Sequence, residues 1–265
     1  MKIYCINLER SHRRRRSMER QFKRFGLKAE FVTAIDSRRL DKKQLDAISD
    51  TKAVKEAPHW LLPGIIACSA SHRLCFQKMI EAQDSYALIL EDDVILHKDI
   101  VEVLKNLEAQ IKTGEVLMLY FQSKKTINFS KAGMNNVNTN HHLMYPVNFE
   151  WLGSSGAYLI SLDVAKKLYD HEYPIKSCID SWGRFIASGW IKTLRVLIPF
   201  AAHSSLEESA VDYVDPKRLK GKIKKIIATL RLFPFYQFLH WRRKQHWKKS
   251  TQYVFTDMPS PLQKE

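Results

Sequence analysis

The stretch Leu88–Leu96 places three consecutive carboxylates, Glu91, Asp92 and Asp93, inside an apolar run that is typical of a buried strand. Ionised carboxylates are disfavoured away from water and close to one another, so a desolvated cluster of three requires a cation or protons. Such a cluster usually lies at the C-terminal end of a strand, where the chain opens into a cleft. Hard oxygen ligands of this kind suit Mg²⁺ or Mn²⁺, usually together with substrate phosphates. The stretch therefore favours a nucleotide-dependent transferase, although acidic residues after a strand also cap the next helix.

Length and composition are those of a globular protein. The 265 residues suffice for one large α/β domain or for one domain and a tail, and 45% of them are hydrophobic. No apolar run approaches the ~20 residues of a transmembrane helix, and Met1–Leu8 has the pattern of a strand, not of a secretory signal. We therefore expect a cytoplasmic protein. Its four cysteines have no zinc-like spacing and are expected to be free thiols, with Cys68 and Cys75 as small core residues.

The apolar pattern predicts an α/β fold that opens with a strand, a helix and a strand, as parallel sheets do. The predicted strands are Lys2–Leu8, Ala29–Ala34, Tyr86–Leu90, Val116–Phe121, Gly156–Ile160 and Leu194–Pro199, the last of which closes the sheet. The predicted helices are Ser11–Phe25 with Ser11 as its cap, Gly64–Ala82, Asp99–Ile111, Ser161–Tyr169 and Ile179–Ala187. Arg38–Pro63 is a polar excursion with helical patches, and the weakly periodic Ser123–Asn148 is predicted to be a long mobile loop near the cleft.

Polar residues at the end of the first predicted strand are candidates for binding a ligand. Ligands of open α/β sheets bind outside the carboxyl ends of the strands, which is where we expect Asn7, Leu8 and Arg10. Asn7 could bond a uracil or a ribose, and Arg10 a diphosphate, because a guanidinium matches phosphate geometry. Four arginines follow at positions 13–16. Successive residues of a helix are ~100° apart, so the four arginines cannot all face one ligand. Either they all lie on a solvated face of the helix, or one of them, Arg14, contacts a phosphate.

Positive charge is concentrated near the C-terminus. Lys217–Lys249 contains twelve Lys or Arg and no Asp or Glu, and subtracting these twelve from the 43 Lys and Arg of the chain leaves 31 against 28 acidic residues. Aromatic residues alternate with these charges, and Pro234 divides the segment. Such a segment could bind nucleic acid or an anionic membrane surface, or it could be a helical arm that packs on the body or on a second subunit. The near-neutral body weighs against a nucleic-acid-binding protein.

Four short motifs follow one another along residues 2–203. They are Cys5–Ser11 with the arginines at 13–16, Phe31–Asp36, Gly64–His72 and Leu88–Val94. In this order they resemble four features of glycosyltransferase family 25, the bacterial lipopolysaccharide and lipooligosaccharide glycosyltransferases. These features are the opening "INL-x-R-S-x-x-R-R", the second strand, "G-x-x-G-C-x-x-S-H" and "ILEDDV". Ala67 stands in place of one glycine of the third feature. The resemblance implies a GT-A fold, a nucleotide-sugar donor that is typically UDP-galactose, a divalent metal and inversion at the anomeric carbon.

The resemblance also implies roles for the acidic run and for two histidines. In a GT-A fold the last acid of such a motif usually reaches the ion, so Asp93 is expected to bind Mn²⁺ or Mg²⁺. Glu91 or Asp92 would contact the donor ribose or a metal-bound water, and Glu91 is a second candidate metal ligand. His203, after the last predicted strand, is a third candidate ligand or a loop histidine. His72, within a family motif, lines the donor site or is a core histidine.

An inverting transfer requires a general base that takes the proton of the acceptor hydroxyl. Asp180 matches the position of a family aspartate that follows the Gly156–Ile160 strand and its helix, and it is our candidate for that base. The same residue could be a helix N-cap. Trp151, together with Ser154 and Ser155, could form a platform for the acceptor sugar, because aromatic faces stack on pyranose rings, or it could be a core tryptophan.

We therefore predict a GT-A-like, Rossmann-type mixed sheet with flanking helices over residues 1–215, and a basic, aromatic, helical extension over residues 216–265. The predicted function is metal-dependent, inverting transfer of a sugar, expected to be galactose, from a UDP-sugar to a lipooligosaccharide or lipopolysaccharide core. We expect a peripheral protein on the inner face of the inner membrane, held there by Lys217–Lys249, and a homo-oligomer is compatible with this segment. Two alternatives stay open: a lipooligosaccharide-binding protein without catalysis and a nucleic-acid-binding protein.

Overall fold

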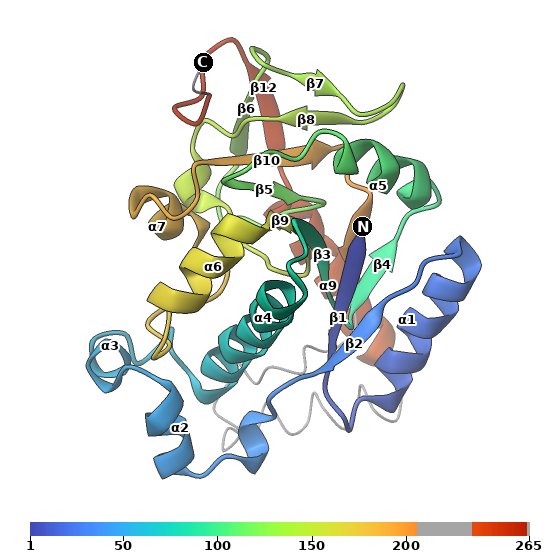
Figure 1. Ribbon diagram of the computed structural model, residues 1–265. Helices are drawn as coiled ribbons and strands as arrows, with labels where there is room; N and C mark the ends of the chain where they lie inside the picture. The colour runs from blue at the N-terminus through green and yellow to red at the C-terminus, as the bar shows by residue number, and fades with distance from the viewer. Residues whose placement is uncertain (206–234, 264–265) are drawn as a thin grey trace.

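The computed structural model describes residues 1–205 and 235–263. Its centre is an eight-stranded sheet with the strand order β2-β1-β3-β9-β5-β10-β8-β7 (Figure 1). In that order the strands are Glu30–Thr33, Lys2–Asn7, Tyr86–Glu91, Ala157–Ser161, Glu115–Met118, Thr193–Ile198, His142–Met144 and Asn135–Asn136. β1 lies parallel to β2 and β3, whereas β9 runs antiparallel between β3 and β5. The predicted α/β fold with a mixed sheet is therefore confirmed.

Helices cover both faces of this sheet. They are α1 (His12–Phe25), α4 (Pro63–Ala82), α5 (Ile100–Glu108) and α6 (Leu162–His171). Alternate residues of a strand point to opposite faces, and β1 shows the result: Tyr4 and Ile6 pack with α4 and α6, whereas Ile3 and Cys5 pack with α1 and α5. Figure 1 shows α4 and α6 side by side on one face. Burial on both faces explains the continuous apolar runs of the central strands.

Local sequence signals set most helix ends. Gly26 ends α1 in the left-handed conformation, with φ 64°. Ser11 precedes α1 as predicted, but its side chain makes no cap hydrogen bond, so the predicted cap is wrong in that respect. The polar excursion forms η1 (Ser37–Arg39), α2 (Lys42–Ile48) and α3 (Thr51–Glu56). Asp41 and Asp50 cap α2 and α3 by accepting hydrogen bonds from the backbone N–H groups of the first turns.

The segment Ser123–Asn148 is built from strands, so the prediction of a long mobile loop was wrong. It contains β6 (Ile127–Ser130), β7 and β8, and Ile127 and Leu143 are fully buried. β8 pairs antiparallel with β10, which places β10 inside the sheet although it was predicted to close it. β7 and β8, with two and three residues, are too short to show the alternation by which strands are recognised in a sequence.

The end of the chain packs against the body. α9 (Phe235–Ser250) is followed by β12 (Tyr253–Thr256), which pairs in parallel with β6. Leu262 is buried in the main core, and the ring of Trp247 lies 5.5 Å from that of Tyr120 between centroids. Residues 250–263 are thus part of the folded body, although we assigned them to an extension. The predicted boundary at residues 215 and 216 lies outside the described residues.

Within residues 1–205 and 235–263, no helix combines the length and the apolar character needed to cross a lipid bilayer.

Candidate functional site

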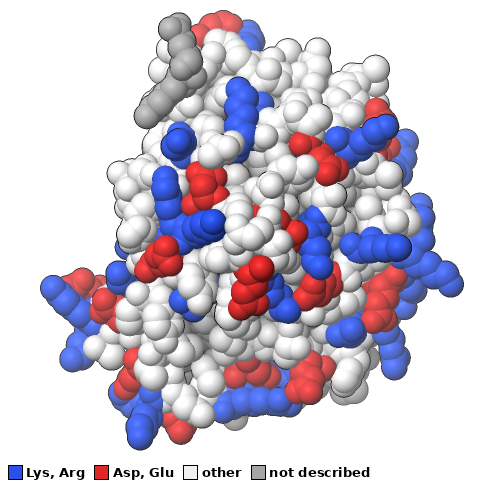
Figure 2. Space-filling view, in the orientation of Figure 1, with Lys and Arg blue, Asp and Glu red and all other residues white. Residues whose placement is uncertain are grey.

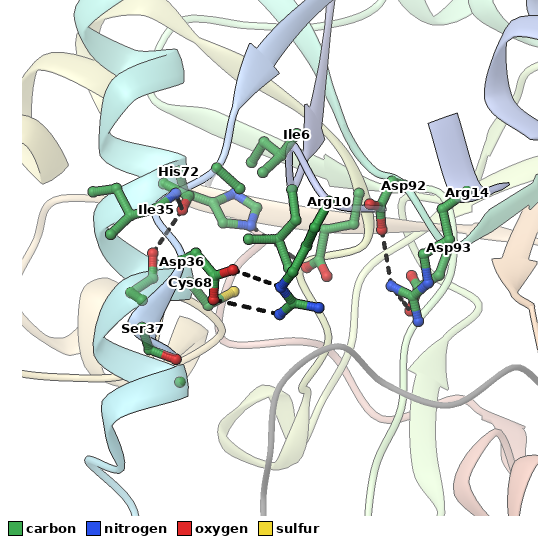
Figure 3. A pocket seen from close by; sticks show the side chains of 16 residues that line it. Ile6, Arg10, Arg14, Ile35, Asp36, Ser37, Cys68, His72, Asp92 and Asp93 are labelled. Carbon is green, nitrogen blue, oxygen red and sulfur yellow. Dashed lines mark hydrogen bonds and ion pairs between the residues drawn. The ribbon is translucent and has the colours of Figure 1, made fainter. Parts of the chain in front are cut away.

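A pocket opens at the carboxyl ends of β1, β2 and β3, beside the N-terminal half of α4 (Figure 3). The empty space between its walls and out into its open mouth amounts to about 570 Å³. Its wall includes most of the residues that we proposed for the donor and the metal, namely Leu8, Arg10, Arg14, His72, Glu91, Asp92 and Asp93. The fold therefore gathers at one place residues that are up to 85 positions apart in the sequence.

Two side chains of the protein donate hydrogen bonds to the carboxylate of Asp92. Its carboxylate accepts hydrogen bonds from Asn7 Nδ2 at 2.7 Å and from Arg14 Nη1 at 2.9 Å. Burial raises the pKa of Asp92, and the interactions with Arg14 and Asn7 oppose that shift. Asn7 is the last residue of β1 and Arg14 lies in the first turn of α1. Asp92 therefore joins the ends of three elements at the pocket wall, and Asn7 supports the pocket through it.

Glu91 and Asp93 are two buried acids of the pocket whose pKa values shift in opposite directions. Burial and the charge of Glu91 raise the pKa of Asp93 to about 7, although Arg14 Nη1 lies 3.5 Å from its carboxylate. Burial also acts to raise the pKa of Glu91, but its interactions with His72 and Ser155 outweigh burial and hold that pKa below its ordinary value. A divalent cation would stabilise both ionised carboxylates.

His72 is both a core residue and a residue of the pocket wall. Its ring is fully buried, and Nδ1 lies 2.8 Å from the hydroxyl of Tyr158. Its Nε2 faces Glu91 Oε1 at 3.4 Å, and the same oxygen accepts a hydrogen bond from Ser155 Oγ at 2.7 Å. Cys68, one helical turn earlier, also lines the pocket, which corrects its prediction as a plain core residue. All four cysteines are free thiols, as predicted.

Asp180 is connected to this pocket through a short loop. Its Oδ2 accepts a hydrogen bond from the backbone N–H of Ser154 at 3.1 Å, and the next residue, Ser155, bonds Glu91. The helix α7 (Trp182–Ala187) begins after Asp180 and has Ser181 as its N-cap, so the alternative N-cap role of Asp180 is wrong. Burial raises the pKa of Asp180, and the charge of Glu91 acts in the same direction. The raised pKa makes Asp180 a stronger base than an ordinary aspartate.

Trp151 lies on the surface and not in the core. Trp151 is the last residue of the short helix η2 (Phe149–Trp151), and it is 39% exposed. The ammonium nitrogen of Lys125 lies 3.6 Å from the centroid of its ring. The alternative of a core tryptophan is therefore wrong. Ser154 donates its backbone N–H to Asp180, and Ser155 donates its hydroxyl to Glu91, so these two contacts fix the loop between the two acids. Ser154 adopts a positive φ of 82°.

His203 lies outside the pocket wall. It belongs to β11 (Ala202–Ser204), which pairs with β4 (Val94–Leu96), and its Nδ1 lies 2.9 Å from Nε2 of His97. Among the residues that the structure describes, Cys68, His72 and Glu91 form the group of three Cys, His or acidic residues whose ligand atoms all lie within 4.8 Å of one another. The predicted set of Asp93, Glu91 and His203 is therefore not assembled. The position of His203 after the last long strand could not reveal its pairing with His97.

Arg10 lines the pocket in an ion pair with Asp36, an acid that the sequence motifs contained but to which we had given no role. Arg10 Nε donates to Asp36 Oδ2 at 2.5 Å, and Nη2 donates to Oδ1 at 3.4 Å. The hydrogen bond from Arg10 lowers the pKa of Asp36 in spite of burial. Asp36 follows β2 just as Arg10 follows β1, so its place after a neighbouring strand was the available signal. A diphosphate that binds Arg10 must compete with this ion pair.

Residues 1–182 match a family described as glycosyltransferase family 25 (LPS biosynthesis protein). The chain belongs to glycosyltransferase family 25. The matched region contains the whole pocket wall together with Trp151, Ser154, Ser155 and Asp180. His203 and the C-terminal elements from β10 onward lie beyond it.

Relatives of this family 25 chain occur in insects and in a bacterium. A "Glycosyltransferase 25 family member" of Aedes aegypti is 30% identical over 189 residues, which cover 67% of this chain and 29% of that protein. A protein of Drosophila melanogaster with the same description is 29% identical over 179 residues, 63% of this chain and 27% of that protein. The "Lipooligosaccharide biosynthesis protein lic2B" of Haemophilus influenzae is 28% identical over 174 residues, 63% of this chain and 62% of that protein.

The matches thus span less than a third of these insect relatives and under two thirds of the bacterial one. The family is not confined to bacteria, so the bacterial setting that we had attached to it is supported only in part.

Proposed function

We propose that this family 25 chain transfers galactose from UDP-galactose to a lipooligosaccharide or lipopolysaccharide core, with inversion at the anomeric carbon and on a fold of the GT-A type. The observation that carries the proposal is the pocket at the carboxyl ends of β1 and β3, where Glu91 and Asp93 lie with Arg10 and Arg14. Nucleotide ligands of α/β sheets bind at this edge. The bacterial relative, whose name refers to lipooligosaccharide biosynthesis, supports the acceptor class.

The pocket fits a divalent cation such as Mn²⁺ or Mg²⁺. Asp93 and Glu91 offer the hard oxygen donors that these ions prefer, and a cation would offset the burial and the charge of Glu91 that raise the pKa of Asp93. The ion, when bound, supplies Lewis-acid stabilisation of the diphosphate leaving group. Arg14, 3.5 Å from Asp93, adds positive charge on the same side of the pocket. Arg10 would bind the diphosphate after its ion pair with Asp36 has broken.

Asp180 is the proposed general base. It would take the proton of the acceptor hydroxyl while that oxygen attacks the anomeric carbon. The backbone N–H of Ser154 fixes one carboxylate oxygen at 3.1 Å. The exposed ring of Trp151 provides a surface on which the acceptor sugar can stack.

In the presence of Mn²⁺, UDP-galactose is expected to raise the melting temperature of the protein more than UDP-glucose or UDP-N-acetylglucosamine does. A ligand that binds the folded state stabilises it according to its affinity. A thermal-shift series over these donors, followed by assays of UDP release with Mn²⁺ and with EDTA, measures this. Equal shifts for all three donors would remove the galactose assignment. UDP release that EDTA leaves unchanged would remove the metal.

The two alternative functions predict other results in the same assays. A lipooligosaccharide-binding protein without catalysis would release no UDP from any donor in the presence of acceptor. A nucleic-acid-binding protein would show no shift with a nucleotide sugar. Against the latter, the face seen in Figure 2 carries basic and acidic side chains interspersed, without a continuous basic surface that would follow a phosphate backbone.

We propose that the basic C-terminal segment attaches the protein to the cytoplasmic face of the inner membrane. In the described part of that segment, α9 carries exposed Lys244, Lys248 and Lys249, and Trp241 is 54% exposed. The part from Lys217 to Pro234 lies outside the described residues. Anionic lipid headgroups attract such lysines by roughly 1 kcal/mol each.

The protein is therefore expected to sediment with vesicles that contain phosphatidylglycerol and to stay in solution with neutral phosphatidylcholine vesicles. A variant with Lys244→Glu, Lys248→Glu and Lys249→Glu should bind less, because three attractive charges become repulsive. Equal recovery in the supernatant for both lipids would exclude surface docking. In that case sedimentation without lipid would test a contact between subunits, and packing of α9 on the body, as in the contact of Trp247 with Tyr120, would be the other role for the segment.

A further inference from the structure

The pocket wall brings together three ligand atoms of different chemistry. Cys68 Sγ, His72 Nε2 and a carboxylate oxygen of Glu91 all lie within 4.8 Å of one another. Cys68 and His72 are four residues apart on α4, so they share one face of that helix. Figure 3 shows both side chains directed from α4 into the pocket. Glu91 approaches from the end of β3, on the central sheet.

His72 is held in the orientation that a metal ligand requires. Its ring is fully buried, and Nδ1 bonds the hydroxyl of Tyr158 at 2.8 Å. Its Nε2 has no hydrogen-bond partner. Glu91 Oε1 lies 3.4 Å away, within ion-pair distance, but the geometry is not that of a hydrogen bond. A buried polar atom without a partner is costly, and metal-binding histidines typically have their second ring nitrogen fixed by such a neighbour.

The spacing fits a tetrahedral ion. Two nitrogen or oxygen ligands at about 2.0–2.1 Å from zinc lie about 3.3 Å apart at a tetrahedral angle. The distance of 3.4 Å from His72 Nε2 to Glu91 Oε1 already has this value. Zinc–sulfur bonds of about 2.3 Å require Cys68 Sγ to come to about 3.5 Å from the other two ligands. From a separation within 4.8 Å, this is a movement of roughly 1 Å for a side chain with a single torsion.

We propose that Cys68, His72 and Glu91 bind a zinc ion in the wall of this pocket, with its fourth position open to an oxygen ligand in the pocket. A set of one thiolate, one imidazole and one carboxylate selects zinc over Mg²⁺, which prefers oxygen alone. The inference rests on this cluster and not on sugar transfer. Glu91 is also a proposed ligand of Mn²⁺ beside Asp93, so zinc would compete with Mn²⁺ for this carboxylate.

Cobalt replaces zinc as the probe in the test, because a thiolate bound to Co²⁺ gives a charge-transfer absorption in the near ultraviolet. The full chain, freed of metal, is expected to show this absorption together with the intense visible bands of tetrahedral Co²⁺. Addition of zinc should remove both. Cys68→Ser should lose the absorption and bind zinc about a hundredfold more weakly, since even loss of an outer partner of a zinc ligand costs 10–100-fold.

Cys178→Ser is the matched control, because Cys178 is also a half-buried free thiol and does not belong to the cluster. This variant should keep the absorption and the zinc affinity. His72→Gln and Glu91→Gln supply independent tests should Cys68→Ser fail to fold, and each should weaken zinc binding while its melting curve stays cooperative. Three results would overturn the proposal: a wild-type Co²⁺ spectrum without a thiolate band, wild-type zinc affinity in Cys68→Ser, or loss of the band in Cys178→Ser. None of these measurements depends on sugar transfer.

Discussion

Asp93→Asn is expected to bind UDP no better with Mn²⁺ than without it and to lose transfer activity by about a hundredfold or more. The carboxylate that it removes is one of the two proposed ligands of Mn²⁺. A metal that stabilises a leaving group contributes several kcal/mol, and each ~1.4 kcal/mol is a factor of ten in rate. Calorimetric titration of UDP in Mn²⁺ and in EDTA, combined with turnover of UDP-galactose, measures both effects. Full turnover by the variant would exclude Asp93 as a required ligand.

A stability measurement separates this loss from a failure to fold. Burial and the charge of Glu91 raise the pKa of Asp93 to about 7, above the ~3.9 of an unfolded chain. Ionisation of Asp93 therefore lowers the stability of the metal-free fold as pH rises from about 4 through about 7. An amide cannot ionise, so Asp93→Asn should melt no lower than the wild type at pH 8. A lower melting temperature would indicate that Asp93 is a structural residue.

Asp92→Asn is the matched control for the neighbouring acid. Asp92 accepts hydrogen bonds from Asn7 and Arg14 at 2.7 and 2.9 Å, one on each carboxylate oxygen, and an amide has a single acceptor oxygen, so one of these two donors would face an NH₂ group. This variant is expected to melt at a lower temperature but to keep an Mn²⁺-dependent affinity for UDP. The two variants together assign ligand binding to one acid and support of the pocket to the other.

The elements that frame the pocket could be predicted from the sequence because each carries a strong local signal. β1 and β3 are continuous apolar runs, α4 is a long and largely apolar segment, and Gly26 marks the end of α1. The antiparallel insertion of β9 between β3 and β5 depends on pairing between distant segments, so nothing local reveals it. The same holds for β6, whose partner β12 lies more than 100 residues away.

The site was predictable to the extent that it follows strand ends. Glu91, Asp92 and Asp93 were found because charges are rare inside an apolar run, and Arg10 because it follows β1. Cys68 was missed because a cysteine within an apolar helix has the composition of a core residue. The proposed metal role of His203 came from its position in the chain order, whereas its bond to His97 depends on the pairing of β11 with β4.

Asp180→Asn is expected to keep donor binding and to lose transfer activity by about 10²–10⁴-fold, the usual contribution of a general base. The amide oxygen can still accept the hydrogen bond that Ser154 N–H donates at 3.1 Å, so the loop keeps its position. It cannot take a proton from the acceptor hydroxyl. Steady-state kinetics of UDP-galactose and acceptor, together with UDP titrations, separate kcat from affinity. Asp170→Asn, an exposed aspartate on α6, should turn over like the wild type.

The pH dependence distinguishes a base from a residue that merely supports the loop. Burial and the charge of Glu91 raise the pKa of Asp180, and a base is active only when it is deprotonated, so wild-type kcat should rise with pH through that raised pKa. The residual activity of Asp180→Asn should lack this rise. A structural role would instead lower the melting temperature and the UDP affinity together with kcat. Wild-type turnover in Asp180→Asn would show that Asp180 is not the general base, and the proton of the acceptor hydroxyl would then be taken by another group.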